Sequence, residues 1–272
     1  MPHTVNGSDP LSLDDPTSAS SSPERAAASL PEAVHSASPE ILTSAASDPA
    51  LTEDLALGLL RRSDLPAQVL AQLSKNSVLM KSRKLQLALV EHPRTPRHVS
   101  LPMVRHLFTF DLMQVALTPA VPADIRMAAE ESLIRRLERL PQGERLSLAH
   151  RASGRVAAEL LHDPEPRVLR AALENSRLTE AEITKALMRR DAPATMVGTV
   201  CHHTRWSARR EIRIALLHNE ATPLDRALEF ARSLPAALVR ETLRDSRLSA
   251  AAKERLRDAL EDRGEDGREE GF

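Results

Sequence analysis

The stretch Ile212-Arg-Ile-Ala-Leu-Leu-His-Asn-Glu-Ala-Thr-Pro223 decides the fold, because it describes one helix ending and another beginning. A near-copy, Leu85-Gln-Leu-Ala-Leu-Val-Glu-His-Pro-Arg-Thr-Pro96, lies 223 − 96 = 127 residues earlier. In both, an apolar run around an alanine stops at polar residues that lead into Thr-Pro. We expect Thr95 and Thr222 to be N-caps, whose hydroxyls accept from free backbone N–H groups of the next helix. Each proline then occupies the first helical position, where its missing N–H costs nothing.

A third, looser copy is Val168-Leu-Arg-Ala-Ala-Leu-Glu-Asn-Ser-Arg-Leu-Thr179. It runs into Thr179-Glu-Ala-Glu182, a capping-box sequence that replaces the proline of the other copies. Beyond the phrase, the first two copies stay aligned over about 50 residues with one single-residue gap. A recurring unit that cannot bury its apolar face alone predicts an α-solenoid of stacked helix pairs.

These phrases resemble the helical repeats of bacterial HEAT-like and leucine-rich-repeat-variant proteins. The stretch His162-Asp-Pro-Glu-Pro-Arg-Val-Leu-Arg170 is similar to the start of a HEAT second helix. The resemblance covers about residues 51–262 and implies an α-solenoid with a binding role. Some leucine-rich-repeat-variant proteins carry a Cys-rich iron–sulfur segment, which a chain with one cysteine cannot match. A few HEAT-like proteins are DNA glycosylases with aromatic and acidic residues on the concave face, and no matching cluster occurs here, so no catalytic residue is carried over.

The composition favours an all-α fold. Apolar residues make up 42% of the chain but aromatic residues only 2%, with no Tyr, four Phe and one Trp. A core must therefore consist of Leu, Ala, Val and Ile, which suit the close packing of helices. Runs of β-branched and aromatic residues, which would indicate strands, are scarce.

The sequence divides into three parts. Residues 1–50 are rich in Ser and Pro and have a net charge of 1 − 7 = −6, so we predict a disordered acidic arm. This arm is either a solvated tail or a segment that shields the basic body or docks to a partner. The helical period predicts a repeat domain over residues 51–262, with a candidate subdomain seam at 141–143. Residues 51–263 carry 35 − 27 = +8, and we expect residues 263–272 to form a disordered tail.

The cellular location follows from what the sequence lacks. A single cysteine, Cys201, excludes an internal disulfide framework and favours a reducing compartment. The N-terminus has no basic and apolar regions of a secretory signal, and no apolar run approaches the roughly 18 residues that span a membrane. We therefore expect a bacterial cytoplasmic protein that does not interact with membranes.

The adjacent Cys201, His202 and His203 form a candidate metal site. Zinc usually takes four ligands from spaced pairs, whereas three consecutive residues of a helix point in different directions. We therefore expect a buried core cysteine and two histidines at a helix end, with no metal or other cofactor. Three further histidines recur at or beside helix ends: His92, His162 and His218. They are either a ligand ladder or pH sensor, or simply cations that stabilise the last carbonyls of their helices.

Arginine accounts for 32 of the 37 basic residues, and its densest group lies just before the opening phrase. Arg205, Arg209 and Arg213 follow one another at intervals of four residues, which predicts one face of a helix, and Arg210 lies beside them. Arginine binds carboxylates and phosphates with its planar fork. We interpret this group either as a solvated face with ion pairs or as a surface for an anionic partner, a protein segment rather than nucleic acid, because aromatic residues for base stacking are scarce.

No motif in the sequence indicates catalysis. The eight glycines are scattered, and no phosphate-binding glycine loop, nucleophile elbow or HExxH sequence occurs. The sequence thus predicts a non-enzymatic helical-repeat scaffold that binds a protein partner, with binding of nucleic acid or another polyanion through the arginines as the alternative.

Overall fold

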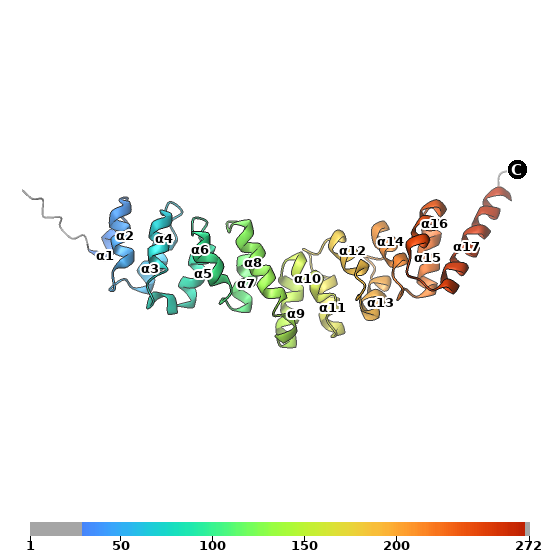
Figure 1. The fold of residues 1–272 in the computed structure, drawn as a ribbon, viewed down its shortest axis with the longest axis horizontal. Coiled ribbons are helices and arrows are strands. Elements are labelled where there is room, and N and C mark those ends of the chain that lie inside the picture. Colours follow the sequence, from blue (N-terminus) through green and yellow to red (C-terminus); the bar gives the residue numbers. More distant parts are fainter. Residues whose placement is uncertain (1–28, 270–272) are drawn as a thin grey trace, which may run out of the picture.

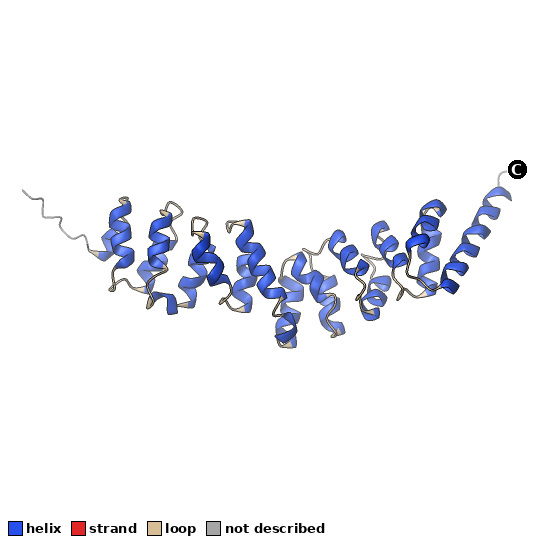
Figure 2. Ribbon diagram, viewed as in Figure 1, coloured by secondary structure: helices blue, strands red, loops and turns tan. Residues whose placement is uncertain are grey.

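The computed structural model describes residues 29–269, which contain helices and no strand (Figures 1 and 2). The α-helices are α1 (Leu30–Ala33), α2 (Pro39–Ser47), α3 (Glu53–Leu60), α4 (Ala67–Leu73), α5 (Arg83–Glu91), α6 (Arg97–Val104), α7 (Thr109–Leu117), α8 (Ala123–Ile134), α9 (Gln142–Arg151), α10 (Gly154–Leu160), α11 (Pro166–Leu173), α12 (Glu180–Met188), α13 (Ala194–His202), α14 (Arg210–His218), α15 (Leu224–Ser233), α16 (Ala236–Asp245) and α17 (Ala250–Glu269). Two short 3₁₀ helices, η1 (Leu79–Lys81) and η2 (Leu137–Arg139), precede α5 and follow α8.

The helices stack in two layers along an elongated, gently curved arc (Figure 1). In one layer α2 packs on α4, α6 on α8, and α8, α10, α12, α14 and α16 follow one another. In the other, α3, α5 and α7 form one series, while α9 packs on α11, α11 on α13, and α15 on α17. The predicted α-solenoid of stacked helix pairs is therefore confirmed.

The core consists of the aliphatic residues that the composition predicted. Of the largest fully buried side chains, one is Phe230 and the others named are Leu or Ile, such as Leu112 and Ile125. Alanines such as Ala129 and Ala172 are wholly buried where helices approach one another. Small and branched residues thus alternate across the layers, as close helix packing requires.

The threonines of the repeated phrase do not cap the following helix, so that prediction was wrong. The N-cap residues are Pro96 and Pro223 themselves. The hydroxyl of Thr95 instead donates to the carbonyl of Leu89, and that of Thr222 donates to Leu216, each at 2.6 Å. The physical reason is burial: a buried hydroxyl requires a partner, and the last carbonyls of the preceding helix have none of their own. The third copy does follow the prediction, because Thr179 and Glu182 form a capping box.

At four helix ends a polar side chain also connects a repeat to the repeat before it. At the end of α14, Nδ2 of Asn219 donates to the carbonyl of Leu187 in α12 at 2.9 Å. At the end of α16, Oγ of Ser246 donates to the carbonyl of Leu217 in α14 at 2.6 Å. Both side chains are buried, with 2% and 6% of their surface exposed.

The other layer uses the same connection. Nδ2 of Asn175, after α11, donates to the carbonyls of Ala149 and Ala152 in and after α9, at 2.8 and 3.1 Å. Nε2 of His92, after α5, lies 2.8 Å from the carbonyl oxygen of Arg62, after α3. Because Nδ1 of His92 accepts from a backbone N–H, the proton resides on Nε2.

We call these four buried side chains the inter-repeat clasps: His92, Asn175, Asn219 and Ser246. Each clasp also accepts from the backbone N–H two residues further on, at 2.8 to 3.2 Å, and so closes its own turn. One side chain therefore satisfies a carbonyl of the neighbouring repeat and an N–H of its own repeat.

The folded part of the chain is longer at both ends than the sequence predicted. Helices α1 and α2 lie within the expected disordered arm, and α2 packs on α4 with Leu42, Ala45 and Ala46 buried. Apolar residues that are scattered in the sequence are sufficient to bury this helix, because they lie on one of its faces. At the other end α17 continues to Glu269 instead of ending near residue 262. The remainder of the arm and tail, residues 1–28 and 270–272, lies outside the described residues.

The candidate seam at residues 141–143 is not a break in the core. Leu137 and Leu148, on either side of it, belong to one hydrophobic cluster that runs from Val90 to Leu260. A second cluster extends from Ala33 to Val99, so the apolar core divides at α5 and α6 instead. Helix α8, which precedes this position, ends at Ile134 and is followed by the short η2.

We predict that Asn219→Ala lowers the free energy of unfolding by about 2–4 kcal/mol, because it removes two hydrogen bonds and leaves a buried carbonyl and N–H unsatisfied. Urea denaturation followed by circular dichroism measures this loss. The matched control is Glu220→Ala at the exposed neighbouring position, which we expect to change stability by less than about 0.5 kcal/mol. Equal losses for the two variants would show that the clasp contributes nothing specific.

Candidate functional site

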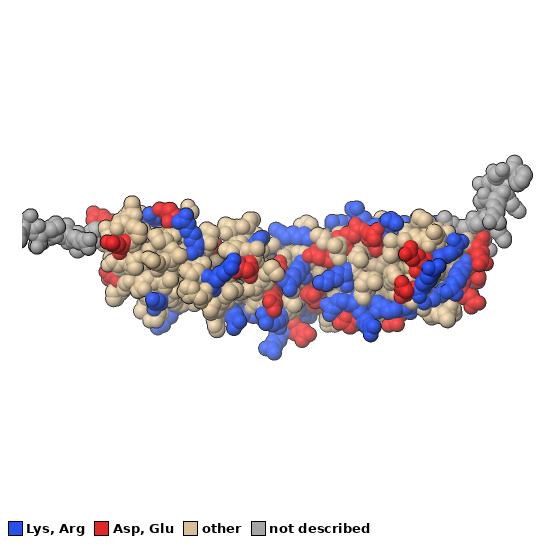
Figure 3. Space-filling view, turned by 45° about the horizontal axis from the view of Figure 1, so that its top comes forward, with Lys and Arg blue, Asp and Glu red and all other residues tan. Residues whose placement is uncertain are grey.

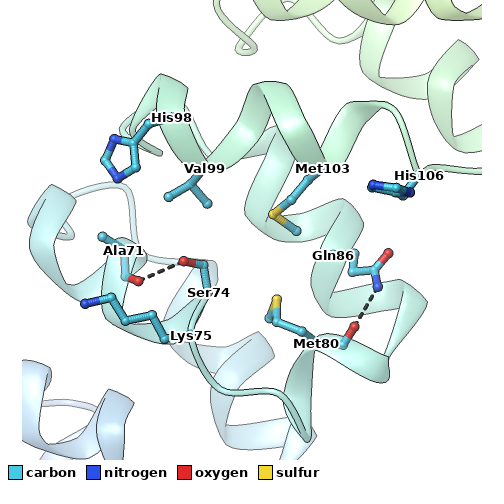
Figure 4. Close-up of a pocket in the computed structure, with 9 residues that line it drawn as sticks. All are labelled: Ala71, Ser74, Lys75, Met80, Gln86, His98, Val99, Met103 and His106. Atoms are coloured by element: carbon cyan, nitrogen blue, oxygen red, sulfur yellow. Dashed lines mark hydrogen bonds between the residues drawn. The ribbon is translucent and has the colours of Figure 1, made fainter.

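The most distinctive surface feature is an open groove of about 590 Å³ between α4 and α6. Helices α4 and α6 make little contact with one another, unlike their successors α6 and α8. Figure 4 shows side chains from both helices, and from η1 and α5, directed toward the space between them. The lining residues are Ala71, Ser74, Lys75, Met80, Gln86, His98, Val99, Met103 and His106.

The turn between α4 and α5 contributes to this separation. Oδ1 of Asn76 accepts from the backbone N–H groups of Val78 and Leu79, at 3.1 and 3.2 Å, and so stabilises the start of η1. The extra turn places Met80 in the groove, where its carbonyl accepts from Nε2 of Gln86 at 2.6 Å (Figure 4). Among residues 29–269, no side chain of α6 donates to the last carbonyls of α4, so no inter-repeat clasp draws the two helices together.

By contrast, the next step of the same layer is held by an arginine. Nη1 of Arg136, after α8, donates to the carbonyl of Leu107 at 2.7 Å, and its Nη2 donates to that of Arg105 at 2.6 Å. Both acceptors follow α6. The groove therefore lies at a step of this layer that has neither such a connection nor close packing of its two helices.

The chemistry of the groove is apolar below and basic at the rim. Val99 is buried, and the partly buried Met80 and Met103 form its apolar lining. Lys75, His98 and His106 are exposed at the rim. These three side chains have no hydrogen bond or ion pair to any described residue, which leaves their polar groups available to a ligand.

The chain around the groove is strongly basic. From Ala67 to Arg105 it carries seven Lys and Arg and one acid, a net charge of 7 − 1 = +6. The single acid, Glu91, already accepts from Nε2 of Gln114 at 2.7 Å. Two of the cations are neutralised by acids outside this stretch, Arg83 by Asp111 and Arg97 by Asp124. The remaining charge favours a ligand with carboxylate or phosphate groups.

The arginines singled out in the sequence do not form one helical face, so that prediction was wrong. Helix α14 begins at Arg210, whereas Arg205 lies in a turn and Arg209 is the N-cap. The cause is Trp206, which is buried and donates from Nε1 to the carbonyl of Leu173 at 2.8 Å. Since this position holds the indole against α11, residues 203–209 cannot continue a helix.

These arginines are also partly engaged by their neighbours. The guanidinium of Arg205 stacks 4.2 Å above the Trp206 ring, and Nη1 of Arg210 lies 3.3 Å from a carboxylate oxygen of Glu211. Nε of Arg213 donates to the carbonyl of Ser207 at 2.8 Å.

Acids also surround the arginine group. Residues 205–229 carry five arginines and four acids, a net charge of 5 − 4 = +1. On the face shown in Figure 3, cations and acids alternate over the C-terminal half of the arc. The sequence stretch that contains the groove, residues 67–105, therefore has a larger net positive charge than the stretch around these arginines, +6 against +1.

The candidate metal residues separate into unrelated roles. Cys201 is buried, and desolvation raises the pKa of its thiol to about 12. His202 Nδ1 lies 2.8 Å from the carbonyl oxygen of Gly198, and His203 Nε2 lies 3.1 Å from a carboxylate oxygen of Glu174. Within residues 29–269 no group of three or more His, Cys, Asp and Glu side chains is arranged to hold a metal ion.

The three histidines at helix ends likewise differ from one another. His92 is an inter-repeat clasp, while burial lowers the pKa of His162, aided by the nearby Arg189. The backbone carbonyl of His218 accepts from the N–H of Arg247 at 3.0 Å.

Comparison with known proteins gives no relative: no family model matches the chain, and neither a curated protein nor a solved structure is significantly similar to it. In the part of the chain that the structure describes, no helix has the length and apolar character needed to cross a membrane. Because no relative indicates a site, the groove is a candidate binding site on the grounds of its geometry and charge alone. The sequence contained one signal for it, the near absence of acids between residues 67 and 105.

We predict that Cys201 is inert toward a thiol-specific disulfide reagent at pH 8 in the native protein. Its thiol is buried and, with its pKa raised to about 12, remains protonated at that pH. Absorbance after reagent addition measures the reaction, and in urea the thiol should react completely. A Ser77→Cys variant is the control, since this position is exposed and its added thiol should react at once. Rapid reaction of two thiols in that variant would show that α13 opens readily.

Proposed function

We propose that the protein is a non-enzymatic scaffold that binds another protein, with the α4–α6 groove as its docking site. The observation that carries this proposal is the combination of an apolar lining with three unpaired basic side chains, Lys75, His98 and His106, at its rim. Pockets of roughly 300–1,000 Å³ with an apolar lining and a few polar groups are typical binding sites. The groove is open to solvent, which suits an extended or helical peptide segment.

The elongated form of the protein supports the same proposal. Stacked helical repeats present long continuous surfaces, and their usual role is to hold partners. We further propose that the repeats are of the HEAT-like type and that the protein acts in the bacterial cytoplasm. The single cysteine, buried and without a disulfide partner, supports a reducing compartment.

We predict that a partner bound by the wild-type protein is lost from the double variant Lys75→Glu/Met103→Ser. The first change reverses a rim charge, and the second removes part of the apolar lining, so binding should weaken at least tenfold. The matched control is Lys185→Glu/Met188→Ser, which makes the same changes at two exposed positions of α12. Affinity capture from cells that naturally make the protein, quantified by mass spectrometry, compares the three proteins. A set of bound proteins that is identical for all three would contradict the docking site.

The second candidate function is binding of nucleic acid or another polyanion through the Arg205, Arg209, Arg210 and Arg213 group. The basic character of the body, +8 over residues 51–263, favours it in general terms. The surrounding acids and the small net charge around these arginines weaken it.

We predict that a mixed-sequence single-stranded oligonucleotide is not shifted in electrophoresis at physiological salt. Few exposed aromatic side chains are available for base stacking, and the arginine group is largely neutralised. At low salt any weak shift should be equally present in the variant Arg209→Ala/Arg210→Ala. A strong shift that this variant abolishes would instead support the polyanion function.

A further inference from the structure

We propose that the α4–α6 groove is occupied by the chain's own N-terminal segment, Leu11-Ser-Leu-Asp-Asp15, which external partners must displace. This inference rests on the proposed function, because it concerns the same groove. Residues 1–28 lie outside the part that the structure describes, so the argument uses their sequence and length together with the geometry of the groove.

The first step is chemical complementarity. Leu11 and Leu13 are the only leucines among residues 1–28, and an extended backbone directs residues two apart to the same side. They therefore suit the apolar lining formed by Val99, Met80 and Met103. The groove's volume of about 590 Å³ is sufficient for two such side chains.

The second step is charge. Asp14 and Asp15 directly follow the leucines, and residues 1–28 carry four acids and one arginine, 1 − 4 = −3. The groove lies in a stretch with a net charge of +6, and Lys75, His98 and His106 at its rim have no acidic partner in the described chain. Carboxylates beside the leucines would meet Lys75 and the histidines at the rim, as complementary surfaces require.

The third step is the local preference of the segment. Pro10 and Pro16 bracket it, and the residue before each proline is biased toward extended backbone. A proline on either side also prevents the segment from joining a longer helix. An extended segment of five residues would suit this open groove.

The fourth step is reach. Fourteen peptide units separate Asp15 from Ser29, which span at most ~46–50 Å when extended. Helix α1 contacts α2, and α2 contacts α4, so the groove beside α4 is about 20–30 Å from α1 at usual interhelical distances. The tether is therefore long enough. The acidic C-terminal residues cannot compete, because α17 lies at the opposite end of the arc and its tail has no leucine (Figure 1).

The experiment measures a distance within the full-length chain. Nitroxide labels are attached to Thr17→Cys, next to the segment, and to Val78→Cys, which is 71% exposed at the edge of the groove. Cys201 remains unlabelled because it is buried. Pulsed dipolar spectroscopy should give a narrow distance distribution between the two labels if the segment is docked.

Two variants in the same labelled background should abolish this narrow distribution. Leu11→Ser/Leu13→Ser removes the apolar anchors, and Lys75→Glu/Met103→Ser alters the groove. The matched control Lys185→Glu/Met188→Ser should retain it. Dilution with unlabelled protein should leave the signal unchanged, and its disappearance would overturn the proposal by showing that the segment docks on a second copy.

A broad distribution in the wild-type background, unaffected by either variant, would also overturn the proposal. The capture experiment is independent of this outcome. If Leu11→Ser/Leu13→Ser raises partner recovery at least threefold, the segment competes with the partner. If partner capture depends on the groove residues but not on Leu11 and Leu13, the proposed docking site is supported and the proposed docking of the N-terminal segment is contradicted.

Discussion

The fold depends on how the chain satisfies the carbonyl groups that every helix leaves free at its C-terminal end. A chain of short helices has many such groups, and most are buried between repeats. At four helix ends an inter-repeat clasp satisfies such a carbonyl with a single side chain: Asn219, for example, donates to the helix before it and accepts from its own turn. Asn175, His92 and Ser246 repeat this geometry with different chemistry, because each offers a donor and an acceptor on a short side chain.

The same constraint explains where a binding surface is available. Where Arg136 connects the end of α8 to the end of α6, the two helices pack closely. Between α4 and α6 this connection is missing, the apolar core divides, and a hollow with a basic rim results. A smaller hollow lined by Phe110, Met113, Leu117 and Arg151 lies beside α7 and α9, which also make little contact. Its lining contains one basic residue, Arg151, and lacks the histidines of the α4–α6 groove.

The sequence predicted the architecture well and the site poorly, for physical reasons. Thr-Pro identifies a helix boundary, but only burial shows that the hydroxyl of Thr222 serves the preceding helix. The spacing of Arg205, Arg209 and Arg213 fits a helix. It does not show that the indole of Trp206 is buried against α11, which determines the backbone conformation at this turn. The predicted disordered arm was too long, because the composition of a segment does not show that Leu42 is buried against a neighbouring repeat. The charge excess around Lys75 is visible in the sequence, whereas the separation of two helices that exposes it is a tertiary property.

The clasps also have a mechanical meaning. Each clasp joins only adjacent repeats. At these four steps a force along the arc is therefore transmitted through the clasp as well as through the packing of the helices. The step from α4 to α6 has no such link on its layer and retains only the packing of α5 on its neighbours. Bending should therefore concentrate at this step, which makes it the most compliant joint of the arc. A ligand bound in the groove would bridge α4 and α6 and so stiffen the molecule at this step.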